Sequence, residues 1–203
     1  MIRQGDKPSW ILSTDAPRNL NFAMYVACSY DILPQTEPFL RAQLWSAYHP
    51  DSLHHEETTT LTAEWEQWWN SVVGDRAENH LQGRWSRHFD PNGRFEDLPE
   101  PLRDKCRLAF PSFVDWWGHT AGGQQGVNYW DIADQFEFVV QQVEKEIGHS
   151  AFPFRLYVDY VYTGLGRIIE MESNYCVMSV ARPSESVHRR DWWLAKVRRL
   201  AVE

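Results

Sequence analysis

Cysteine is scarce in this sequence of 203 residues, with only Cys28, Cys106 and Cys176 present. Their number is odd and no two stand at a CxxC spacing, which argues against a disulfide framework or a cysteine-rich zinc site. Each cysteine lies among apolar residues. We therefore expect three buried, unreactive thiols.

Long apolar runs are also missing. The longest early run, from Phe22 to Cys28, has 7 residues, far below the roughly 18 needed to span a bilayer. The N-terminal residues MIRQGDKPSW lack the apolar core and the small-residue cleavage site of a signal peptide. The sequence therefore predicts a soluble cytoplasmic protein with no membrane association.

Basic residues are in deficit, since 20 Lys and Arg stand against 28 Asp and Glu, a formal charge of −8. An acidic balance argues against general nucleic-acid binding, which depends on neutralising phosphates. Residues 182–203 are the exception, with six basic and three acidic side chains. Two interpretations remain open: the basic face of a C-terminal helix packs near the acidic body, or this tail binds a partner or a nucleic acid.

Aromatic residues are abundant, with 11 Trp, 8 Tyr and 10 Phe. Hydrophobic residues make up 43% and charged residues 24% of the chain, as in globular proteins. No Pro-, Ser- or Gly-rich linker divides residues 1–203, so we predict a single globular domain. Three Trp pairs are either core residues or stacking platforms for sugars or bases; they are Trp68-Trp69, Trp116-Trp117 and Trp192-Trp193.

The first half of the chain is expected to be mainly helical. Residues 1–20 read as an irregular lead-in, and residues 21–29 fit a strand or a helix equally well. A polar loop over 51–61 precedes a helix that Thr62 caps and Gly74 ends. Residues 99–118 form two helical pieces that Pro111 separates or kinks. The glycine-rich residues 122–126 are expected to form a loop.

The second half predicts a helix over 132–147, an antiparallel hairpin over 155–173 and a basic amphipathic helix over 184–202. Gly164-Leu165 meets the glycine requirement of a type II′ turn. That turn would set Asp159 opposite Glu170 and Tyr157 opposite Glu172. The fold class is therefore α+β: a mainly helical N-terminal half packed with a C-terminal antiparallel sheet and a C-terminal helix.

Strand alternation would gather polar side chains on one face of this hairpin, namely Arg155, Tyr157, Asp159, Glu170 and Glu172. Two facing carboxylates repel unless water, a base or a metal ion compensates them. One interpretation is a solvated face, on which Asp159→Asn would be neutral or slightly stabilising. The other is a ligand-binding pocket, with Asp159 and Glu170 as candidate ligands of a divalent ion such as Mg²⁺. No other cofactor is predicted.

No catalytic motif is present: HExxH, GxSxG and the P-loop are all missing. The run His54-His55-Glu56-Glu57 reads as part of a solvated loop. Three function classes remain. The favoured one is a non-catalytic interaction, inhibitor or regulatory protein with a protein partner, because the chain is acidic and aromatic-rich. The alternatives are a metal-assisted hydrolase that uses the acidic sheet face and a Trp-lined domain that binds a small ligand or sugar.

Overall fold

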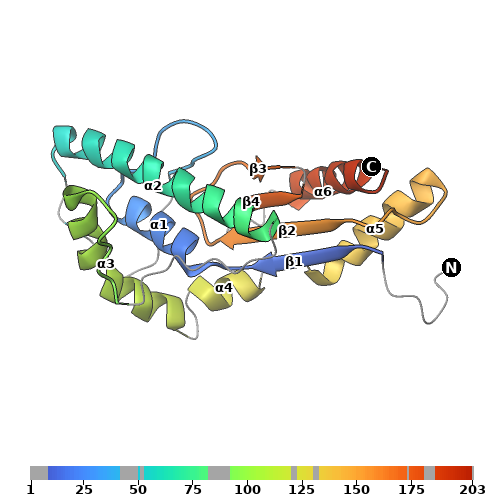
Figure 1. Cartoon of the computed structure of the whole chain (residues 1–203), viewed down its shortest axis with the longest axis horizontal. Helices are drawn as coiled ribbons and strands as arrows, with labels where there is room; N and C mark the ends of the chain where they lie inside the picture. Colours follow the sequence, from blue (N-terminus) through green and yellow to red (C-terminus); the bar gives the residue numbers. More distant parts are fainter. Residues whose placement is uncertain are drawn as a thin grey trace.

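The computed structural model describes residues 9–41, 50, 53–81, 92–119, 123–129, 133–172, 174–180 and 186–202. The elements, in chain order, are β1 (Ile11–Asp15), α1 (Arg18–Ser29), α2 (His55–Leu81), α3 (Glu100–Gly118), α4 (Gly123–Tyr129), α5 (Ala133–Ile147), β2 (Arg155–Val161), β3 (Ile169–Met171), β4 (Tyr175–Ser179) and α6 (Ser186–Leu200). The predicted α+β class is confirmed. Figure 1 shows an elongated molecule, with α3 toward one end and α5 and α6 toward the other.

The four strands form one mixed sheet in the order β1-β2-β4-β3. Strands β1, β2 and β4 run parallel, and only β3 is antiparallel to its neighbour β4. The predicted antiparallel hairpin over 155–173 is therefore wrong. Strand β4 lies between the two segments expected to pair, so that Tyr157 neighbours Tyr175 and Glu170 neighbours Cys176.

The segment around Gly164 pairs with a distant part of the chain. Gly164 has a positive φ of 98°, as a glycine-dependent turn requires. However, its carbonyl accepts a hydrogen bond from the Leu40 amide, and the Gly166 amide donates to the Pro38 carbonyl. Phe39 and Leu165 form an antiparallel bridge at the same place. Because these backbone groups bond to residues 38–40, the chain leaves the sheet here instead of folding back along β2.

The lead-in expected over residues 1–20 contains regular structure. Ile11–Asp15 is an edge strand, and α1 begins at Arg18. Residues 21–29 are helical, which resolves the ambiguity left by the sequence. Nine residues of α1 are buried, including the polar Asn19 and Asn21. Because these nine buried residues are consecutive, no exposed polar side marks the segment, which is why the sequence left strand and helix open.

Two helices are longer than the sequence indicated. Helix α2 begins at His55 and continues past Gly74 to Leu81, so the polar loop predicted up to residue 61 and the helix end predicted at Gly74 are wrong. The hydroxyls of Thr58, Thr59 and Thr60 donate to carbonyls four residues earlier, which satisfies them inside the helix. Helix α3 runs from Glu100 to Gly118 with the exposed Pro111 inside it, so the two helical pieces expected over residues 99–118 belong to one helix.

The other helical predictions have mixed outcomes. The loop predicted around residues 122–126 is wrong in part, since α4 begins at Gly123. The helices predicted near 132–147 and 184–202 are confirmed as α5 and α6. The expected inward side of α6 is buried as predicted, namely Trp193, Val197, Leu200 and Ala201.

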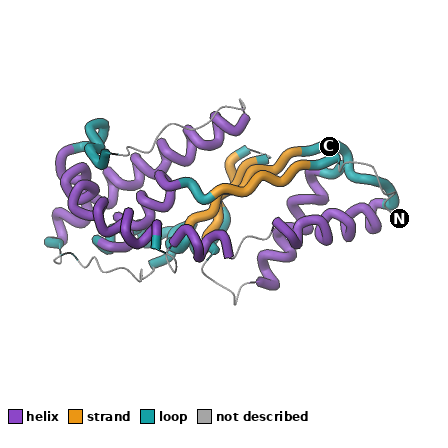
Figure 2. The backbone as a smooth tube through the Cα atoms, turned by 90° about the horizontal axis from the view of Figure 1, so that it is seen from below, coloured by secondary structure: helices purple, strands orange, loops and turns teal. Residues whose placement is uncertain are grey.

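Helices cover both faces of the sheet (Figure 2). The C-terminal third of α2 contacts the face that carries Asp159, through Arg76. Helices α5 and α6 pack on each other and lie against the opposite face, where α6 contacts Glu170 through Lys196. Asp159 is therefore covered by α2 and does not lie on the open sheet face expected from the sequence.

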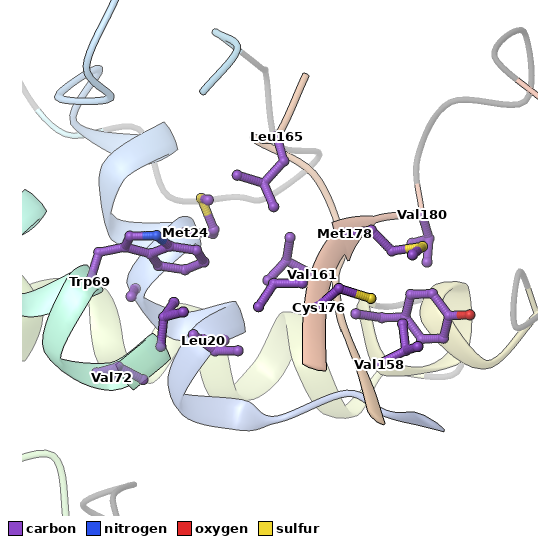
Figure 3. Packing of buried hydrophobic residues seen from close by; sticks show 14 of the residues in the cluster. Leu20, Met24, Trp69, Val72, Val158, Val161, Leu165, Cys176, Met178 and Val180 are labelled. Carbon is purple, nitrogen blue, oxygen red and sulfur yellow. The ribbon is translucent and has the colours of Figure 1, made fainter. Parts of the chain in front are cut away.

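Helix α1 leaves β1 and packs at the carboxyl end of β2. The side-chain amide of Asn21 donates to the Tyr160 carbonyl, and its oxygen accepts from the Tyr162 amide. Figure 3 shows Leu20 and Met24 of α1 with Trp69 of α2, gathered against Val161. This packing joins the helical end of the molecule to the sheet.

Candidate functional site

A cluster of polar side chains is buried between α2 and the sheet. Asp159 is 0% exposed and accepts two hydrogen bonds from Arg76, from Nε at 2.7 Å and from Nη2 at 2.6 Å. The Tyr175 hydroxyl donates a third at 2.8 Å. Arg76 Nη2 also donates to Asp15, at 2.8 Å. We call Asp15, Arg76, His80, Asp159 and Tyr175 the Asp159 cluster.

Regular secondary structure brings this cluster together. Asp15 and Asp159 are register partners on the parallel strands β1 and β2, so their side chains leave the same face of the sheet. Tyr175 lies on β4, next to Tyr157 of β2. Arg76 and His80 are four residues apart on α2 and therefore point to the same side of that helix.

The electrostatics of the cluster are those of an internally compensated ion pair. Burial alone would raise the pKa of Asp159, but the adjacent His80 ring and the Arg76 guanidinium outweigh it and lower that pKa below its usual value. Burial and the Asp159 charge raise the pKa of the Tyr175 phenol. Asp159 is thus a carboxylate held between a cation and a neutral phenol, which compensates its burial.

Within the Asp159 cluster, His80 has a ring nitrogen, Nε2, without a hydrogen-bond partner. Its ring stacks on Tyr157, with centroids 4.7 Å apart, and lies 5.3 Å from the Tyr175 ring. Its Nε2 is 3.6 Å from Asp159 Oδ1, too far for a hydrogen bond, and has no other partner. A carboxylate beside an imidazole resembles a general-base pair. Here, however, Asp159 is already occupied by Arg76 and Tyr175, so we assign the cluster a structural role.

Glu170 lies on the opposite face of the sheet. It is in register with Cys176, which neighbours Val158 across β4 and β2, whereas Asp159 points the other way. The expectation that the two carboxylates lie side by side is therefore wrong. In this arrangement they cannot share one metal ion, and the described part of the chain contains no group of three or more His, Cys, Asp or Glu placed to hold one.

Glu170 has its own set of partners on α6. It accepts hydrogen bonds from Trp192 Nε1 at 2.8 Å, from Lys196 Nζ at 2.7 Å and from Arg199 Nη2 at 2.7 Å. Burial opposes ionisation, but these donors lower the pKa of Glu170 to about 2. Lys196 is 1% exposed, so this pair holds α6 against the sheet.

The remaining predicted site residues do not converge. Tyr157 is half-buried against His80, and Arg155 is exposed at the start of β2. Glu172 is exposed just after β3, with a positive φ of 58°. That these residues bind a ligand stays a prediction.

Sequence reasoning identified Asp159 but missed its partners. Arg76 and His80 carried one usable signal, their i, i+4 spacing within a helix. Asp15 ends a short strand, ILSTD, which lies inside the segment predicted to be irregular. Its partner is 144 residues away along the chain, and no local pattern indicates such a pairing.

The exposed side of α3 is the second feature that the sequence pattern did not single out. We call the exposed residues Pro101, Asp104, Arg107, Leu108, Pro111, Val114, Asp115 and Gly118 the α3 outer face. Leu108 is 64% exposed and Val114 is 44% exposed. With Pro111 between them they form an apolar strip about 9 Å long, at 1.5 Å per helical residue. Their signal in the sequence is that they fall outside the buried stripe of α3.

The basic tail packs on acidic and polar partners within the chain. Arg198 pairs with Glu146 of α5 at 2.8 Å, and Arg199 pairs with Glu170 at 2.7 Å. Arg190 donates to Gln142 at 3.2 Å. Of the two interpretations of residues 182–203, these contacts support the first, in which the basic face of the helix packs near the acidic body.

Comparison with protein-family models, with curated proteins and with solved structures found no significant match. Among the described helices, none combines the length and the apolar character needed to cross a bilayer.

Proposed function

We propose that this protein is a non-catalytic interaction protein that binds a protein partner through the α3 outer face. The observation that carries the proposal is the apolar strip of Leu108, Pro111 and Val114 on that face. Single exposed apolar residues are common on protein surfaces, but Leu108, Pro111 and Val114 lie within two turns of one helix and expose their apolar side chains together. Apolar side chains within a polar rim also match the anatomy of protein interfaces.

The carboxylates considered for catalysis support the same proposal. Asp159 is compensated by Arg76 and Tyr175, and Glu170 by Trp192, Lys196 and Arg199. Side chains saturated by partners within the protein have little capacity left to bind a substrate or a metal ion. The acids of this chain therefore fit a role in stability better than a role in hydrolysis.

The tryptophans support it as well. Of the eight Trp residues whose side chains the structure describes, each is buried or half-buried. Trp65 and Trp69 stack at 5.6 Å, and Trp117 stacks on Phe113 at 5.7 Å, inside the helical half. These rings pack in the core, which favours the interaction proposal over a Trp-lined sugar site.

The proposal is tested by affinity capture from a lysate of the organism that encodes the chain, followed by mass spectrometry. The baits are the wild-type protein, Leu108→Glu, and the matched control Phe138→Glu. Phe138 is 70% exposed on α5, toward the other end of the molecule. Each exposed substitution should change the unfolding free energy by no more than about 0.5 kcal/mol, which urea unfolding verifies first.

We expect a near-stoichiometric protein partner with the wild type and with Phe138→Glu, and its loss with Leu108→Glu. A partner that Leu108→Glu retains would contradict the proposal. Recovery of a bound small molecule in place of a protein would also contradict it and would favour the ligand-binding alternative.

A further inference from the structure

The exposed charged side chains near the apolar strip are mainly acidic, whereas α3 as a whole carries three acids and three bases. Between residues 92 and 119 the exposed charged side chains comprise five acids and two arginines; the acids are Glu96, Asp97, Glu100, Asp104 and Asp115. Arg107 Nη1 lies 3.8 Å from Asp104 Oδ1, and this i, i+3 ion pair compensates the charge of one of the acids. Glu100 and Asp115 then stand near the two ends of the α3 outer face, about 22 Å apart along the helix.

Pro111 interrupts the backbone hydrogen bonding of α3 in the middle of this face. A proline has no backbone N–H, so Pro111 cannot donate the helical hydrogen bond to the carbonyl of Arg107, four residues earlier. Both residues lie on the exposed side of α3.

The neighbouring helix is also acidic. Helix α2 contains six acidic residues and one arginine, a net charge of −5 with His neutral. It is tied to α3 by the ion pair between Glu57 and Lys105, at 2.7 Å. Summed fields of this kind attract partners of opposite charge and raise their association rate.

We infer that the α3 outer face receives a basic amphipathic helix of a protein partner, an inference that rests on the proposed function. The apolar side chains of that helix pack on Leu108, Pro111 and Val114, as in helix-on-helix recognition. Its Lys or Arg side chains flank the apolar stripe and reach Glu100 and Asp115.

The test uses synthetic peptides and the full chain, with binding followed by fluorescence anisotropy. The probe is a labelled peptide of about 14 residues, roughly four helical turns, built from Leu and Lys with all Leu on one face. Two control peptides carry Glu in place of Lys, or the same residues scrambled so that no apolar face forms. The protein variants are Leu108→Gln, the pair Glu100→Gln with Asp115→Asn, and the control Phe138→Gln.

We expect the amphipathic Leu/Lys peptide to bind the wild type and Phe138→Gln with equal affinity. Leu108→Gln should weaken binding about ten-fold or more, as for an interface anchor. The double charge variant should weaken it about three-fold or more and should reduce its sensitivity to salt. Equal binding of the acidic or the scrambled peptide, unchanged binding to Leu108→Gln, or no binding of the Leu/Lys peptide would each overturn the inference.

Failure of this inference is distinguishable from failure of the proposed function. If no peptide binds but Leu108→Glu still loses the captured partner, the interaction role stands and only the partner chemistry is wrong. Sedimentation velocity of the protein alone tests the other possible occupant of the α3 outer face, a second copy of this chain. A dimer that Leu108→Glu converts to a monomer would show that a second copy of this chain covers the face, which would overturn the inference.

Discussion

Substitution of Asp159 tests the assignment of its cluster to stability. The side chain is fully buried, and Arg76, its main partner, is 8% exposed. Removing one partner of such a pair leaves an uncompensated buried charge, at a cost of roughly 3–5 kcal/mol. Arg76 keeps its bond to the half-exposed Asp15, so we expect Asp159→Asn to lose about 3 kcal/mol, at the lower end of that range. On a solvated face the same substitution would have been neutral.

The assay is urea unfolding followed by tryptophan fluorescence, with thermal unfolding as a second probe. A loss of about 3 kcal/mol corresponds to a decrease in Tm of roughly 6–12 °C for a chain of this size. The control Asp15→Asn removes an exposed partner of the same guanidinium and should cost less than about 1 kcal/mol.

A double-mutant cycle isolates the pair itself. Arg76→Met removes the buried cation and should by itself cost about 3 kcal/mol, because Asp159 then lacks a counter-charge. The double variant Asp159→Asn with Arg76→Met should lose clearly less than the sum, by at least about 1 kcal/mol, because neither charge is left unpaired. Strict additivity, or a loss below about 1 kcal/mol for Asp159→Asn alone, would refute the assignment.

Three further outcomes follow from the structure. The pKa of Glu170 is lowered to about 2, so the stability that this carboxylate contributes is complete above its unfolded pKa of roughly 4.3 and is lost as the pH falls toward 2. Glu170→Gln should therefore flatten the dependence of the urea midpoint on pH between these two values. An unchanged slope would argue against the Glu170–Lys196 contact. Burial, aided by Asp31, raises the pKa of the half-buried Cys28 thiol to about 12, and burial also raises the pKa of the Cys106 and Cys176 thiols. A disulfide reagent at pH 8 should therefore react readily with the thiols only after unfolding, and rapid labelling of Cys106 or Cys176 in the native protein would contradict their burial. Gly164 has a φ of 98°, and a Cβ added there would lie 2.8 Å from the Met24 sulfur, so Gly164→Ala should lower the unfolding free energy by more than about 1 kcal/mol; equal urea midpoints for variant and wild type would show that the loop relaxes.

The fold was predictable where the hydrophobic residues follow a single helical period. Residues 133–147 carry a strong helical stripe and residues 186–200 a weaker one, and both are helices with a buried apolar face. Residues 18–29 are also helical, but the nine consecutive residues from Asn19 to Ala27 are all buried, so no exposed polar side marks this segment as a helix. Hydrophobic periodicity therefore identifies a helix only when one side of that helix faces water and the other is buried.

The sheet could not be predicted from local signals. Gly164 does adopt the backbone conformation that its turn requires, yet its carbonyl bonds to the Leu40 amide, 124 residues earlier. The all-buried strand Tyr175–Ser179 then takes the place beside β2. Strand order depends on which of several segments, far apart in the sequence, pairs with a given strand. Turn chemistry fixes the register only when the two strands that flank the turn pair with each other.

The candidate site was likewise predictable only where local strand alternation decides the outcome, and not where distant segments pack together. Alternation along β2 placed Asp159 correctly on the side opposite Val158, but it did not reveal that α2 covers that side. The expected neighbour, Glu170, belongs to the other face because β4 intervenes. The α3 outer face was open to prediction in principle, since apolar residues outside a buried stripe are visible in the sequence once the helix bounds are known.

Site-specific photo-crosslinking tests the central claim, a protein partner on α3, most directly. Benzoylphenylalanine is placed at position 108 or 114, or at the exposed control position 138, and the cells that encode the chain are irradiated before lysis. We expect one discrete higher-mass product from positions 108 and 114 and none of that mass from position 138. Equal products from all three positions, or a product from position 138 alone, would contradict the assignment of the binding surface to α3.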